Sequence, residues 1–125
     1  MHSRRVQLIE PTAQQYRAGA IALLVIATLT AAMIAGAWAG PLDGPLLLPL
    51  IGAYFLFNAG FVIAAVKGGL QTNGGRLGVV AVSLNFAAML LSDSTPIWTA
   101  LSVCAALASL VAAAMLFKDA KASAP

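Results

Sequence analysis

The chain has 125 residues, of which 61% are hydrophobic and only 9% are charged. A soluble domain carries about 25% charged residues, so this sequence has too few charges to cover a surface in water. The single cysteine, Cys104, excludes an internal disulfide. The composition therefore favours one helical domain in a membrane, and we expect no nucleic-acid partner despite the formal net charge of +3.

Four stretches of the chain contain no charged residue: 18–42, 44–66, 77–92 and 94–117. A helix needs ~20 mostly apolar residues to cross a bilayer, where the backbone must satisfy its hydrogen bonds internally. The sequence thus predicts an all-α membrane protein with four transmembrane helices in an antiparallel up-down bundle. The predicted transmembrane domain is 18–117, with helices at about 18–39, 46–66, 77–92 and 97–117, between polar tails at 1–17 and 118–125.

Short connections separate the predicted helices. Two prolines and a glycine mark a tight turn at 41–45, and Asp93-Ser94-Thr95-Pro96 marks another. Turns this short make consecutive helices antiparallel neighbours. The third predicted helix has only 16 residues, about 24 Å, which is less than the ~30 Å hydrocarbon core. We expect protein neighbours or snorkelling side chains to compensate for that difference.

The basic residues predict how the chain is oriented. All seven lie in the first tail, the middle loop or the last tail, which face the same side of a four-helix protein: Arg4, Arg5, Arg17, Lys67, Arg76, Lys118 and Lys121. The other side has only Asp43 and Asp93. Because basic loops stay in the cytoplasm, we expect both termini there. Trp38 and Trp98 then fall at the outer interface, and the alanine-rich composition suggests a bacterial inner membrane.

Two asparagines interrupt the apolar runs of the second and third helices. Asn58 lies eight residues before Val66, and Asn85 lies eight residues after Leu77. In antiparallel helices this places both at about 12 Å from the cytoplasmic end. Tyr54 lies one turn before Asn58, on the same face. The three residues can form an interhelical polar pair, or they can line a path for an ion or small substrate, and the structural alternative is favoured.

Small residues form a stripe on each of the last two predicted helices. One stripe is Gly78, Ala81, Asn85, Ala88 and Ser92, and the other is Ser102, Ala105, Ser109 and Ala112. Small residues allow close backbone approach in lipid, where apolar association has no hydrophobic driving force. We expect the first stripe to face other helices of the chain. The second is our candidate for a face that packs against a partner.

Lys67 and Arg76 flank the glycine-rich middle loop and are candidates for contacts with lipid headgroups. The loop resembles a phosphate-binding loop only in part. Its Gly74-Gly75-Arg76 stands where that motif has Gly-Lys-Ser/Thr, and no strand precedes it. We therefore expect no nucleotide site.

The predicted spans contain no Asp, Glu, Lys, Arg or His. Proton-coupled transport, haem ligation and zinc binding normally need such groups. Four acids, one histidine and one cysteine also provide no catalytic constellation. The sequence thus predicts a non-enzymatic protein without cofactor or metal. Two functions are compatible with it. The first is an accessory, structural or assembly subunit of a larger membrane complex, and the alternative is a small channel or transporter that self-associates.

Overall fold

The structure is a computed structural model that describes residues 13–39, 47–68 and 72–123. These residues form four helices: α2 (Ala13–Ala39), α3 (Leu47–Gly68), α4 (Asn73–Leu90) and α5 (Thr95–Ser123). The predicted tail as far as residue 12 and the predicted turn with Asp43 lie outside the described residues.

Three of the four helices are long and apolar enough to cross a membrane. These spans are Ala13–Trp38, Leu48–Lys67 and Thr95–Ala122. The remaining helix, α4, has 18 residues, and its first turn consists of Asn73, two glycines and Arg76, so this helix is not among the three. The described chain is therefore all-helical, and α2, α3 and α5 are the helices that suggest a membrane protein.

Two of the observed helices extend well beyond the limits suggested by the apolar runs. α2 begins before Arg17, and α5 continues to Ser123, through most of the segment assigned from the sequence to a polar tail. A charged residue is costly in the hydrocarbon core but not in a helix that projects beyond it. The end of an apolar run therefore does not mark the end of the helix in α2 and α5.

α4 begins four residues earlier than its apolar run because Thr72 caps it. The Thr72 Oγ1 atom accepts a hydrogen bond from the Gly75 amide at 3.3 Å, and the Thr72 carbonyl accepts from the Arg76 amide at 2.9 Å. A threonine at this position satisfies amides that have no partner within the helix. α4 then ends at a tight turn, in which the Ser94 amide donates to the Leu91 carbonyl at 3.1 Å.

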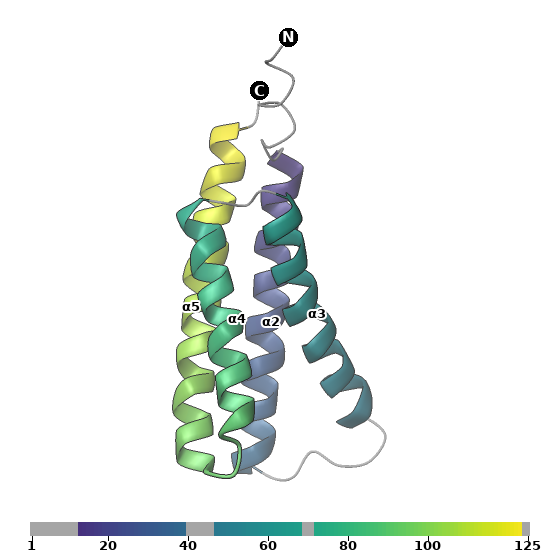
Figure 1. The fold of residues 1–125 in the computed structure, drawn as a ribbon, viewed down its shortest axis with the longest axis vertical. Coiled ribbons are helices and arrows are strands. Elements are labelled where there is room, and N and C mark those ends of the chain that lie inside the picture. Colours follow the sequence, from purple (N-terminus) through teal and green to yellow (C-terminus); the bar gives the residue numbers. More distant parts are fainter. Residues whose placement is uncertain (1–12, 40–46, 69–71, 124–125) are drawn as a thin grey trace.

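The four helices lie along the long axis of the molecule (Figure 1). α5 packs along both α2 and α4, and these are the most extensive contacts in the described chain. α3 contacts α2 and α4 less extensively and diverges from α2 toward its first residues (Figure 1). The first turns of α2, the last turns of α3 and α5, and the beginning of α4 lie at the same end (Figure 1).

The core lies among α2, α4 and α5, with α3 closing one side. Leu23, Ile26, Val82 and Leu116 are among its largest fully buried side chains. Phe61 brings an aromatic ring from α3 into the same cluster. Large apolar side chains are also exposed all around the molecule, including Leu48, Leu56 and Leu90. This surface suits lipid, because in water such extensive exposed apolar area would promote aggregation.

The opposite end of the molecule is held by a bond between α2 and α5. The Trp38 Nε1 atom donates a hydrogen bond to Thr99 Oγ1 at 2.8 Å. Trp38 remains largely exposed, so its ring can lie against lipid while its polar atom is satisfied. This is the combination that places tryptophan at membrane interfaces.

Candidate functional site

Asn58 and Asn85 meet between α3 and α4. The Asn85 Nδ2 atom donates a hydrogen bond to Asn58 Oδ1 at 3.0 Å, and the Asn58 Nδ2 atom donates to the Tyr54 carbonyl at 2.7 Å. Both asparagine side chains are fully buried. Their equal depth in two helices of opposite direction explains the contact, because one polar side chain in an apolar interior needs another at the same level.

A third helix joins this polar network through Thr30. The Thr30 Oγ1 atom of α2 lies 3.5 Å from Asn85 Oδ1, which accepts its hydrogen bond, and Thr30 is also buried. The network thus links α2, α3 and α4 in the middle of the bundle. Sequence reasoning missed Thr30. Its depth in α2 was available as a signal, but threonine often bonds to its own helix backbone, as Thr28 does with the Leu24 carbonyl.

Tyr54 contributes its backbone to this network, and its side chain is buried beside it. The network atoms therefore have protein partners, and Asn58 and Asn85 do not line any of the three surface hollows described for this chain. The geometry is that of a hydrogen-bonded tie between helices. A path for an ion would need side chains that exchange protein partners for the ion.

The small-residue stripe of α5 is buried inside the chain. Ser102, Ala105, Ser109 and Ala112 all have 1% or less of their surface exposed. The expectation that this face packs against a partner is therefore wrong, because α2 and α4 already cover it. Within the described residues, the hydroxyl oxygens of Ser102 and Ser109 have no hydrogen-bond partner. These serines act as small residues that allow close helix packing.

The small-residue stripe of α4 faces the other helices from Gly78 to Ala88, whereas Ser92 lies exposed beyond the helix. Gly78 is the tightest point. A Cβ atom added there would lie 2.5 Å from Cζ of Phe61 and 3.1 Å from Cδ1 of Leu23. Gly78 therefore lets α4 approach both α2 and α3 at the level where the Phe61 ring enters the core.

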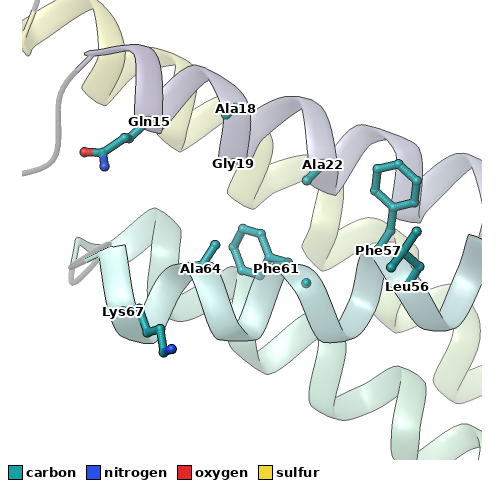
Figure 2. A pocket seen from close by; sticks show the side chains of 10 residues that line it. Gln15, Ala18, Gly19, Ala22, Leu56, Phe57, Phe61, Ala64 and Lys67 are labelled. Atoms are coloured by element: carbon teal, nitrogen blue, oxygen red, sulfur yellow. The ribbon is translucent and has the colours of Figure 1, made fainter.

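A groove of about 540 Å³ runs between α2 and α3 (Figure 2). Its walls are mostly apolar, and its lining is Gln15, Ala18, Gly19, Ala22, Leu56, Phe57, Gly60, Phe61, Ala64 and Lys67. Gln15 of α2 and Lys67 of α3 lie at the same end of the groove on opposite sides of it, while Ala22 and Phe57 lie toward the other end (Figure 2). Small residues line it on both helices, with Ala18, Gly19 and Ala22 on α2 and Gly60 and Ala64 on α3.

Two glycines of α3 have no packing reason within the described chain. A Cβ atom added at Gly52 or at Gly60 would meet nothing within 4 Å. Glycine inside a helix is less stable than alanine by about 0.5–1 kcal/mol, because its backbone loses more freedom on folding. Gly60 lines the groove, so the one helix that packs loosely also carries glycines facing open space.

The two basic residues proposed to contact lipid headgroups occupy different surroundings. Lys67 stands in the last turn of α3 and lines the end of the groove. Arg76 is exposed in the first turn of α4 and does not line the groove. Both lie at the end of the molecule where α2 begins and α5 ends (Figure 1).

In the three described ranges, no group of three or more His, Cys, Asp or Glu side chains is placed to hold a metal ion. Cys104 is exposed on α5, so in a membrane its thiol faces the surroundings of the bundle and does not fill the core. Comparison of the chain with protein-family models, with curated proteins and with solved structures gives no match.

Proposed function

We propose that this chain is a non-enzymatic subunit of a larger complex in a bacterial inner membrane, with an accessory, structural or assembly function. The observation that supports this most strongly is the apolar groove between α2 and α3, together with the open surface at Gly52 and Gly60. Helices in lipid associate through close packing at small residues, so this surface suits a transmembrane helix of another protein.

In this proposal the chain crosses the membrane four times as an antiparallel bundle, with both termini in the cytoplasm. α4 has 18 residues, which corresponds to about 27 Å, close to the ~30 Å core. Contacts with α5 and α3 shield its more polar surface from lipid. The orientation follows from the basic residues, since the described ones, Arg17, Lys67, Arg76, Lys118 and Lys121, gather at one end.

The partner helix that best fits the groove has larger apolar side chains facing Gly60 and Ala64. Both of these residues are exposed on α3, and the groove floor is formed by Phe57 and Phe61. A partner that covers Gly60 would also account for a glycine in mid-helix, because close backbone approach offsets its unfavourable helix propensity.

A pair of alanine-to-leucine substitutions on α3 tests the groove. Ala64 lines it, and Ala59 is exposed on the same helix but does not. We expect Ala64→Leu to fill the groove and release most of the partner, while Ala59→Leu retains it. The measurement is the mass of the tagged chain's assembly after purification in mild detergent, with quantification of the foreign subunits that it contains.

Several results would contradict the proposal. If both variants keep the same assembly, the groove is not the contact. If the native protein is monomeric in detergent and in bilayers and has an activity of its own, it is not an accessory subunit. A homo-oligomer with ion or solute flux that depends on Asn58 and Asn85 would favour the channel alternative. That alternative has less support, since both side chains are buried and hydrogen-bonded to protein atoms.

The orientation has a separate test by cysteine labelling in a Cys104→Ser background. We expect Ser92→Cys, at the exposed junction after α4, to react with a membrane-impermeant reagent in intact cells. We expect Ser3→Cys and Ser123→Cys to react only after the cells are opened. Labelling of Ser3→Cys or Ser123→Cys in intact cells would show that the predicted orientation is wrong.

A further inference from the structure

A second hollow lies where α2 begins and α5 ends, away from the groove. It is lined by Arg17 of α2 and by Phe117, Lys118, Ala120 and Lys121 of α5. Three of these five residues carry a positive charge, and the lining contains no acidic side chain among the described residues. Arg17 and the two lysines, which are far apart in the sequence, come together because α2 and α5 pack along each other.

The position of this hollow along α5 corresponds to the edge of a membrane. α5 has 29 residues and is about 43 Å long, whereas the hydrocarbon core is ~30 Å thick. The helix is therefore longer than the core, and its charged last turns are the part expected to project. Phe117 is the last large apolar residue of α5 and is partly exposed, and the cationic residues Lys118 and Lys121 follow it. The hollow thus has an apolar side toward the bilayer and a cationic side toward the water.

We propose that Arg17, Lys118 and Lys121 bind the headgroup phosphate of an anionic phospholipid, with Phe117 against the start of an acyl chain. The inference requires that α2 and α5 span a membrane, and it does not depend on a partner in the α2–α3 groove. Basic pockets between transmembrane helices on the cytoplasmic side suit anionic headgroups. The planar guanidinium of Arg17 can donate two parallel hydrogen bonds to a phosphate, and the lysines supply compact charges.

The charge arrangement favours an anion in this hollow. Three cations brought together by folding repel one another, and an anion between them removes that repulsion. Asp119 lies in a neighbouring hollow with Thr72 and Gly74, and Lys118 borders both hollows. Asp119 itself does not line the cationic hollow, and its Oδ2 atom has no hydrogen-bond partner within the described residues.

Two arginines at the same end of the molecule provide a matched test. Arg17 lines the hollow, while Arg76 is exposed in the first turn of α4 and does not. The full chain in mild detergent is titrated with phosphatidylglycerol, and the bound lipid is counted by native mass spectrometry. We expect Arg17→Gln to weaken binding of the first lipid by about tenfold or more, and Arg76→Gln to leave it within about twofold. Arg17→Lys should bind less tightly than wild type, because it keeps the charge but loses the planar fork.

The source of the phosphate is tested in the same titration. We expect phosphatidylcholine to compete poorly, because its choline group is repelled by the three cations, and inorganic phosphate at equal concentration to displace no lipid. Equal weakening by Arg17→Gln and Arg76→Gln would mean that general surface charge holds the lipid, and would overturn the proposal. Unchanged binding in Arg17→Gln, equal binding of phosphatidylcholine, or displacement by inorganic phosphate would also overturn it. Circular dichroism of each variant verifies that the helices remain folded.

Discussion

Replacement of Gly78 by leucine is expected to lower the free energy of unfolding by about 3 kcal/mol, the upper part of the usual range for overpacking. The first atom of the new side chain would already lie 2.5 Å from the Phe61 ring and 3.1 Å from Leu23. A leucine adds three more carbon atoms beyond that Cβ, so the Phe61 ring must turn toward the groove between α2 and α3, which it lines, or α4 must move away from α3. Chemical unfolding from mild detergent, followed by circular dichroism, measures the loss.

A pair of glycine-to-alanine variants separates packing from helix propensity. Gly78→Ala is expected to destabilise the chain by about 1 kcal/mol or more, because its Cβ atom meets Phe61. Gly60→Ala has open space around the new atom and is expected to stabilise the isolated chain by about 0.5–1 kcal/mol. If Gly78→Ala proves as stable as Gly60→Ala, then α4 does not approach α3 as closely as the structure places it.

Replacement of Asn85 by alanine is the second change with a large expected effect, a loss of about 2 kcal/mol of unfolding free energy. It removes the hydrogen bond to Asn58 Oδ1 and the acceptor of Thr30 Oγ1, and it leaves both partners buried. Asn58→Leu is expected to cost about 0.5–2 kcal/mol for the same reason. Asn73→Ala is a suitable control, because Asn73 is exposed at the start of α4 and should change stability by less than about 0.5 kcal/mol.

A double-mutant cycle distinguishes a tie between helices from a functional polar site. With Asn58→Leu and Asn85→Leu combined, no unpaired amide of this pair remains, so the total loss should be smaller than the sum of the single losses. Partner binding should survive in the double variant if the pair is structural. Additive losses in stability would mean that the two side chains do not interact. Loss of solute flux with an intact fold would instead assign the pair to a path.

The contact between Asn58 and Asn85 could be predicted from the sequence. The depth of a residue in a membrane can be counted along a helix, so equal depth was available from the sequence, and the two side chains do form a hydrogen bond. The inward face of α4 was available in the same way, from the spacing of Gly78, Ala81, Asn85 and Ala88. The participation of Thr30 was not, because depth alone does not say which polar residues turn toward each other.

The sequence could not show what covers the small-residue stripe on α5. The spacing of Ser102, Ala105, Ser109 and Ala112 identifies a face for close packing, but the pattern is the same whether the chain itself or another protein covers that face. Only the packing of α5 along α2 and α4 decides that the face is internal. The surface left open is instead on α3, at Gly52 and Gly60. The spacing of these two glycines along the helix does not distinguish them from small residues that are buried.

The charge-free runs are enough to predict apolar helices suited to a membrane, because a single segment in lipid satisfies its backbone hydrogen bonds by forming a helix. The sequence also determined the depth of each polar residue, since helical rise is constant. No pattern in the sequence predicts the groove between α2 and α3 or the cluster of Arg17 with Lys118 and Lys121. These features depend on which helices are neighbours and how closely they pack, and that is settled by side-chain fit between segments distant in the chain.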